Sequence, residues 1–283
     1  MILTLEEMLR ITRVGIQLGI SKVRITGGEP LVRAGVVDFI AQISRLSGIK
    51  DLGLTTNGTL LSRHVDSLYN AGLRRVNVGL PSLRPGRYPR LTRGGKLEEA
   101  VRGLTSALDR GFTVKVNVVL MRGINDDEVL DYVRLAKEMP VEVRFIEFMP
   151  LCGAAWQVES FVPLAEIRKG IERIVDLRPL DSNEGVARRF AVDDGVGVVG
   201  FISPLTEPFC SSCNRIRLSA RGILTLCLLK SVGVDLLPLI RRGASDLELE
   251  EAFSRAVSLK PKAHGIELAT CQPQQVFIRS IGG

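Results

Sequence analysis

The sequence has no apolar run close to the roughly 18 residues that a membrane-spanning helix needs. Its opening residues, MILTLEEMLR, lack the basic stretch followed by an apolar stretch that marks a secretory signal. These absences predict a cytoplasmic protein that makes no membrane contact. The composition, 45% hydrophobic and 24% charged over 283 residues, excludes disorder and is typical of one large domain or two.

Aromatic residues are also scarce, at 5% of the chain, and they do not alternate with basic residues in the pattern on which nucleic-acid bases stack. Lys and Arg nevertheless outnumber Asp and Glu by 38 to 31, a formal charge of +7. That excess suits an anionic partner, although it is equally typical of an uninvolved basic surface. Together the two observations favour a small phosphate-bearing molecule over nucleic acid.

Cysteine is rare and unevenly spaced. The sequence contains Cys152, Cys210, Cys213, Cys227 and Cys271. An odd, irregular set is a poor disulfide framework and is typical of a reducing compartment. The spacing of Cys210, Cys213 and Cys227 predicts a metal centre, either an iron–sulfur cluster with one open iron or a zinc site completed by a ligand such as His264. We interpret the other two cysteines as structural.

Strand and helix patterns alternate over the first 150 residues. Five strand patterns separated by amphipathic helices lie at 22–30, 49–58, 74–80, 113–120 and 141–150. This alternation predicts parallel βα units in an open sheet or an incomplete barrel, with ligands at the carboxyl ends of the strands. After residue 150 this alternation ends, and the patterns predict a hairpin, the cysteine segment and helices. We therefore expect one domain over 1–150 and a second over 151–283.

Several residues in these patterns are candidates for a site. The turn GGEP at 27–30 offers exposed amides and one carboxylate for an amine, although double glycines are most often plain turns. Arg24 and Lys115 lie inside strand patterns, where a charge is costly unless it is paired, faces a site or lies on a solvated face. Arg215 and Arg217 alternate on one strand face beside the cysteines, as a phosphate or purine clamp would, or as two solvated arginines.

The sequence resembles the GTP 3′,8-cyclases of molybdenum cofactor biosynthesis in segments that span almost the whole chain. These are VRITGGEPLVR, LGLTTNG, VKVNVVLMRGINDDEV, RFIEFMP, FISPLTEPFCSSCNRIRLSARGILTLC and the terminal IGG. The resemblance implies an α/β fold with an incomplete parallel βα barrel of the radical S-adenosylmethionine (SAM) type and a C-terminal 4Fe-4S domain. It implies conversion of GTP to (8S)-3′,8-cyclo-7,8-dihydroguanosine 5′-triphosphate, which passes to cyclic pyranopterin monophosphate synthase.

The resemblance also implies roles for individual residues. The C-terminal cluster would be bound by Cys210, Cys213 and Cys227. GTP contacts are implied for Arg24, Thr55, Lys115, Arg215 and Arg217. Gly28 and Met149 match positions that contact SAM. Gly282 and Gly283 match a tail that reaches into the active site.

The sequence departs from this family in two places. No CxxxCxxC motif for a second 4Fe-4S cluster occurs in it, so we expect the chain alone to be inactive. The first barrel strand is also missing, which leaves KVRIT with an open edge that a homodimer is one way to cover. Where the family has Ser-Leu-Asp-Ser, this chain has Gly79-Leu80-Pro81-Ser82, without the first serine that contacts SAM.

Three hypotheses remain open from the sequence. The first is that the chain is an N-terminally incomplete copy of an active cyclase, because of a wrong start site or a real truncation. Alternatively, it is a non-catalytic GTP-binding iron–sulfur protein descended from this family. The third alternative is a structural zinc protein, which leaves Arg215, Arg217 and the Gly-Gly tail without a role.

Overall fold

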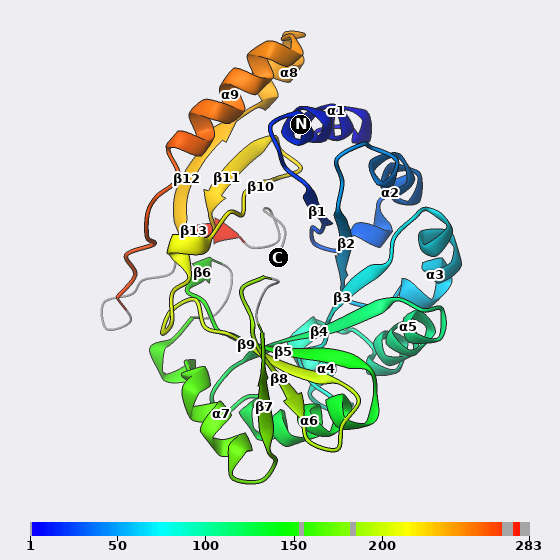
Figure 1. The fold of residues 1–283 in the computed structure, drawn as a ribbon, viewed down its shortest axis with the longest axis vertical. Coiled ribbons are helices and arrows are strands. Elements are labelled where there is room, and N and C mark those ends of the chain that lie inside the picture. Colours follow the sequence, from blue (N-terminus) through cyan, green and yellow to red (C-terminus); the bar gives the residue numbers. More distant parts are fainter. Residues whose placement is uncertain (1, 153–155, 182–184, 268–273, 278–283) are drawn as a thin grey trace.

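An eight-stranded sheet dominates the structure, a computed structural model that describes residues 2–152, 156–181, 185–267 and 274–277. In spatial order its strands are β1 (Lys22–Ile25), β2 (Asp51–Thr56), β3 (Arg75–Gly79), β4 (Thr113–Leu120), β5 (Val141–Glu147), β9 (Val198–Ile202), β8 (Arg188–Val192) and β7 (Leu177–Leu180). The first six in this order are parallel, and β8 and β7 continue the sheet antiparallel. The sheet curves into an open ring (Figure 1).

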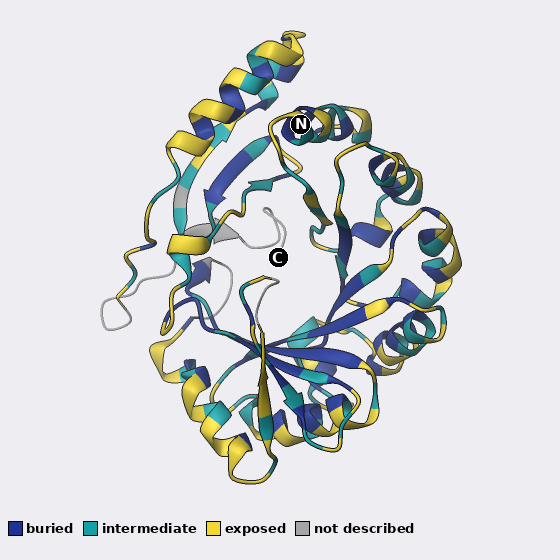
Figure 2. Ribbon diagram, in the orientation of Figure 1, coloured by how far each residue is buried: buried dark blue, intermediate teal, exposed yellow. Residues whose placement is uncertain are grey.

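Helices cover the outer face of this sheet. They are α1 (Leu5–Gln17), α2 (Val36–Ser44), α3 (Leu61–Asn70), α4 (Tyr88–Thr92), α5 (Leu97–Asp109), α6 (Val129–Glu138) and α7 (Leu164–Glu172). Their apolar faces and the outward side chains of the strands form the largest buried cluster. The helices are buried toward the strands and exposed on the outside (Figure 2). The predicted α/β class and incomplete βα barrel are confirmed.

A second unit packs against α1. It consists of a three-stranded antiparallel sheet and two helices: β10 (Arg217–Leu218), β11 (Ile223–Cys227), β12 (Lys230–Asp235), α8 (Leu237–Arg241) and α9 (Asp246–Ser258). Ile11 and Val14 of α1 share a buried cluster with Leu226 and Phe253 of this unit. It lies beside α1 and β1, across the opening of the ring (Figure 1).

The remaining elements are short. β6 (Leu151–Cys152) pairs in parallel with β13 (Gln274–Phe277), and 3₁₀ turns occur at Pro30–Val32, Asp126–Glu128, Val158–Ser160 and Cys210–Ser212. Within the described ranges, β1 has a strand partner on one side only, β2. None of the described helices has the length and apolar character that crossing a membrane requires.

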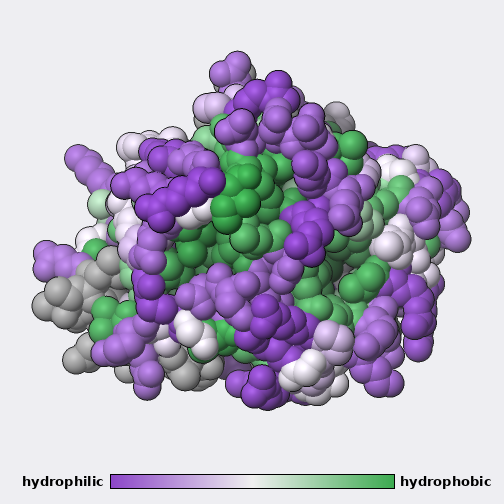
Figure 3. Space-filling view, turned by 90° about the horizontal axis from the view of Figure 1, so that it is seen from below, coloured by the Kyte–Doolittle hydropathy of each residue, from purple (hydrophilic) through white to green (hydrophobic). Residues whose placement is uncertain are grey.

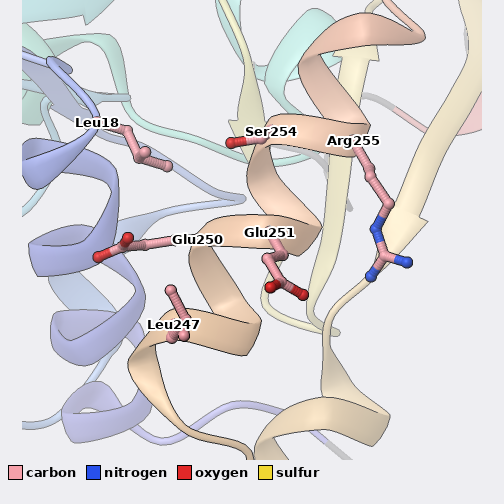
Figure 4. Close-up of a pocket in the computed structure, with 6 residues that line it drawn as sticks. All are labelled: Leu18, Leu247, Glu250, Glu251, Ser254 and Arg255. Carbon is pink, nitrogen blue, oxygen red and sulfur yellow. The ribbon is translucent and has the colours of Figure 1, made fainter.

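The surface at one end of the molecule is partly apolar. Seen from the end at which α6 and α7 lie, hydrophilic groups surround an apolar centre (Figure 3). A shallow pocket lies where the end of α1 meets α9 (Figure 4). Its lining residues are Leu18, Leu247, Glu250, Glu251, Ser254 and Arg255. The pocket lies outside the ring, away from the polar interior described below.

Gly103 of α5 allows that helix to approach the turn after β2. A Cβ added at Gly103 would stand 2.1 Å from the Gly58 carbonyl oxygen and 3.0 Å from Leu61 Cβ. We expect Gly103→Ala to lower the free energy of unfolding by about 3 kcal/mol, because the backbone must move. Urea denaturation measures this. The matched control is Gly170→Ala on α7, where an added Cβ meets nothing within 4 Å and we expect a gain of up to about 1 kcal/mol from helix propensity.

Candidate functional site

The inner face of the sheet is polar, unlike its outer face. Side chains alternate along a strand, so Leu54, Val76 and Val114 pack under the helices while their neighbours face the interior of the ring. One row of interior residues crosses four strands in register: Thr55, Asn77, Lys115 and Glu142. All but Thr55 are buried. Thr55 and Lys115, which the sequence singled out, therefore lie in one row of the same interior.

The carboxylate of Glu142 is the centre of this interior. Its oxygens lie 3.0 Å from Lys115 Nζ, 2.6 Å from Arg144 Nε and 3.4 Å from Arg189 Nε. Burial alone would raise the pKa of Glu142, but Arg144 and Lys115 outweigh burial and hold the pKa below its ordinary value. Burial and the charge of Arg144 likewise lower the pKa of Lys115. One anion therefore serves three cations.

Arg24 and Arg75 add two further cations at the neighbouring strands. Arg24 pairs in register with Gly53, and a Cβ added at Gly53 would stand 3.0 Å from the Arg75 guanidinium. The absence of a side chain at this position thus leaves room for Arg75, which forms an ion pair with Asp51 at 2.7 Å. Burial, together with repulsion from Arg75 and Arg144, lowers the pKa of Arg24 to about 10.

Cations outnumber carboxylates in this interior by five to two. The cations are Arg24, Arg75, Lys115, Arg144 and Arg189, and the carboxylates are those of Asp51 and Glu142. Four buried atoms here, Arg75 Nε, Asn77 Oδ1, Asn117 Oδ1 and Arg189 Nε, have no hydrogen-bond partner in the described part of the chain. Because unpaired buried polar atoms are costly, the arrangement fits a polar, polyanionic ligand.

The cysteine segment stands beside this interior. Cys210 and Cys213 lie on a 3₁₀ turn whose ends are joined by a 3.2 Å backbone hydrogen bond, and Cys227 ends β11. All three thiols are free and partly buried. Burial would raise the pKa of Cys213, but its bonds to Arg215 and that cation lower it, which favours the thiolate.

Two arginines connect these thiols with the barrel. Arg217 lies within electrostatic range of Cys213 and Cys227, and burial lowers its pKa to about 10. Arg215 is close enough to Arg24 to depress the pKa of that side chain further. Cations of the barrel and of the cysteine hairpin, residues 210–227, therefore lie within electrostatic range of one another.

The donor set consists of three thiols, which an iron–sulfur cluster or zinc can use. Three thiolates with an adjacent cation are ligands for such a cluster. His264 is not available as a fourth ligand in this arrangement, because its Nε2 is 2.9 Å from the Pro204 carbonyl and its Nδ1 accepts from Ile266 N at 3.0 Å. No three His, Cys, Asp or Glu side chains among the described residues lie close enough together to hold a metal ion as they stand.

Lys260, just after α9, holds the two arms of the cysteine hairpin. Its ammonium donates to the Arg215 carbonyl at 2.8 Å and to the Leu226 carbonyl at 2.7 Å. Glu147 at the end of β5 fixes the preceding loop, since its buried carboxylate accepts from Leu205 N at 2.8 Å and from the Thr206 backbone and hydroxyl. The position of the thiols is thus set by distant elements.

The GGEP turn is arranged differently from our expectation. Gly27 and Gly28 border open space, as a ligand-binding backbone requires. The carboxylate of Glu29, however, accepts from Thr56 Oγ1 at 2.8 Å, from Asn57 N at 2.7 Å and from Leu31 N. It joins the turn after β1 to the end of β2, and three of its roughly four acceptor positions are already used.

The loop after β3 is ordered by buried contacts. Gly79 borders the interior, whereas Ser82 is fully buried and donates to Glu128 Oε1 at 2.7 Å. Ser82 therefore does not replace the missing serine. Arg87 forms ion pairs with Asp127 and Glu128, which hold this loop against the turn after β4.

Other predicted residues are less informative. Met149 follows β5 and packs, partly buried, in a small apolar cluster with Phe148 and Trp156. Gly282 and Gly283, as well as Cys271, lie outside the described residues. Sequence reasoning missed Glu142, Arg144, Arg75 and Arg189. For the first two the signal was present, because charges alternate with apolar residues in VEVRF just as at Lys115.

The sequence matches two family profiles and many curated relatives. Residues 1–136 match the Radical SAM superfamily and residues 141–266 match Molybdenum Cofactor Synthesis C. The GTP 3′,8-cyclase of Moorella thermoacetica is 44% identical, with 100% of this chain and 88% of that protein aligned. The GTP 3′,8-cyclase of Thermodesulfovibrio yellowstonii is 43% identical, with 100% and 87% aligned.

The fold resembles that of known structures. A crystal structure of Streptococcus suis SuiB bound to S-adenosylmethionine matches with a TM-score of 0.58, over 82% of this chain and 56% of that one. At 14% sequence identity, this likeness concerns the fold alone.

The pairing of Glu142 with cations makes stability depend on pH. Replacing it by glutamine leaves Lys115, Arg144 and Arg189 without their anion, so we expect Glu142→Gln to cost about 3 kcal/mol at pH 7. Because the pKa of Glu142 is lower in the folded state than in the unfolded state, its ion pairs stabilise the fold fully above the unfolded-state pKa. This stabilisation is lost as the pH falls through the folded-state pKa. The difference between the variant and the parent should therefore shrink below about pH 4. Urea denaturation across pH measures this; a difference that does not change with pH contradicts it.

Proposed function

The chain belongs to the GTP 3′,8-cyclase family of radical SAM proteins, and on that basis we propose that it acts in the GTP cyclisation of molybdenum cofactor biosynthesis. Its relatives carry that name at 43 to 44% identity along the whole chain. GTP would be the substrate and SAM the source of the radical. The product, (8S)-3′,8-cyclo-7,8-dihydroguanosine 5′-triphosphate, would pass to cyclic pyranopterin monophosphate synthase.

The observation that carries this proposal is the cationic interior beside three thiols. A triphosphate supplies the anionic charge that Arg24, Lys115 and their neighbours lack. Thr55 and Asn77 lie in the same row and can orient the neutral part of the nucleotide through hydrogen bonds. Arg215, near both Arg24 and Cys213, stands between the barrel and the cysteine hairpin.

The cofactor sites follow from the same residues. Cys210, Cys213 and Cys227 would hold a 4Fe-4S cluster, whose fourth iron supplies an open coordination position for the guanine. Gly28 would place its backbone against SAM, because open space borders it, and Met149 would contact SAM from the end of β5. Gly282 and Gly283 would complete the active site.

The charged groups of this chain have defined tasks in such a reaction. Lys115 and Arg24 would bind and orient the triphosphate, and Glu142 would keep the neighbouring cations charged and directed inward. Arg217, held beside the thiols, would balance their negative charge. The walls of the ring and the hairpin would exclude water from the reacting groups.

One specific observation favours a second candidate, a non-catalytic protein that binds GTP through the C-terminal cluster. Gly79 replaces a SAM-contacting serine of the family, and Ser82 is buried against Glu128 and cannot substitute for it. This difference weakens SAM binding without affecting the residues assigned to GTP. Under this alternative the chain would serve as a binding or regulatory protein, with the open edge of β1 covered in a homodimer or by another segment.

Metal analysis tests the cluster assignment. After anaerobic reconstitution we expect about four irons per chain and a visible absorption band typical of a 4Fe-4S cluster. Cys213→Ser should lose both, because the thiolate is the ligand. The matched control is Cys152→Ser, which should keep both. Stoichiometric zinc without a visible band would instead support the zinc alternative.

Radical formation tests the expectation for the 283-residue chain. The sequence contains no second set of cluster ligands, so reconstituted protein given dithionite and SAM should yield no 5′-deoxyadenosine. The same preparation should bind GTP, which equilibrium dialysis measures. Production of 5′-deoxyadenosine would overturn the expected inactivity, and absence of GTP binding would overturn both candidate functions.

A further inference from the structure

Arg189 lies in the polar interior but comes from the antiparallel part of the sheet. On β8 it pairs in register with Gly200 of β9, and Gly200 pairs on its other side with Arg144 of β5. Arg189 and Arg144 therefore occupy the same row, with a glycine between them. A Cβ at Gly200 would stand 3.6 Å from Arg144 Cγ, so the stem of Arg144 occupies the space above that glycine.

Comparison with the neighbouring Arg188 shows that Arg189 is the arginine of this pair that faces the interior. Arg188 faces the opposite side of β8, has 60% of its side chain exposed and pairs with Glu207 at 2.9 Å. The side chain of Arg189 is 28% exposed and lies toward Glu142. Two adjacent arginines thus separate into one outer ion pair and one interior cation, as alternation along a strand requires.

The negative charge near Arg189 does not fully compensate its guanidinium. Its Nε lies 3.4 Å from Glu142 Oε2 but is buried without a hydrogen-bond partner among the residues described. The Glu142 carboxylate is already bound to Lys115 and Arg144 at shorter distances. A buried guanidinium N–H without an acceptor is unfavourable, so an anion entering the interior would supply what this group lacks.

We propose that Arg189 is a further binding residue for the phosphate chain of the nucleotide, held in position by Glu142. This inference rests on the proposed function, because it takes GTP as the ligand of the interior. It adds a cation from the β8–β9 hairpin to those contributed by the parallel strands. The hairpin thereby becomes part of the binding wall in addition to extending the sheet.

Nucleotide binding by the reconstituted full chain tests this role. We expect Arg189→Met to weaken GTP binding at least about tenfold, the equivalent of 1.4 kcal/mol, while leaving the affinity for guanosine within about twofold. Arg188→Met is the matched control and should leave both affinities unchanged. Arg189→Lys should recover part of the GTP affinity, since it restores the charge but not the fork of donors.

The outcomes separate the inference from the proposed function. An equal loss of GTP and guanosine affinity, or no loss of either, overturns the role of Arg189 while GTP binding by the parent chain stands. If the parent chain binds guanosine and GTP equally, or binds neither, the proposed function itself fails. Thermal unfolding of each variant shows whether it is folded. If Arg189→Met is misfolded, the ratio of GTP affinity to guanosine affinity in Arg189→Lys tests the role of Arg189 instead.

Discussion

The buried carboxylate of Glu142 is the constraint on which the interior depends. A ring of apolar strands tolerates inward lysine and arginine only where their charge is compensated. Glu142 compensates in part, since one anion is shared among Lys115, Arg144 and Arg189. The interior therefore remains short of negative charge. An interior with this excess of cations suits a polyanion, the class of ligand that we propose for it.

Glycines inside strands make this arrangement sterically feasible. Gly53 and Gly200 each lie between two strands that carry arginines, and their missing side chains leave space that Arg75 and Arg144 fill. Interior glycine usually weakens a strand. Here glycine leaves the volume near the sheet that the guanidinium groups occupy, beside the row formed by Thr55, Asn77 and Lys115.

The sequence allowed the fold class and the strands to be predicted, and it singled out several residues whose roles stay predictions. Local signals sufficed for Arg24, Lys115 and the cysteine spacing, because a charge in an apolar strand or a CxxC turn is visible in a few residues. Arg189 could not be found in this way, since it reaches Glu142 only because β9 lies next to β5, which is distant along the chain. The engagement of Glu29 by residues at the end of β2 was hidden for the same reason: it joins positions distant in sequence. Pairing across long loops is decided by topology, which residue patterns do not encode locally.

The three hydrogen bonds accepted by Glu147 have a kinetic consequence. They hold the loop before Cys210 against the end of β5, 58 and 59 residues away along the chain. Contacts of such sequence separation form late, after the strands that bring them together have paired. The cysteine turn therefore reaches its place only once β5 and β9 are joined. We expect the three cysteines to reach their final positions only after the strands of the barrel have paired.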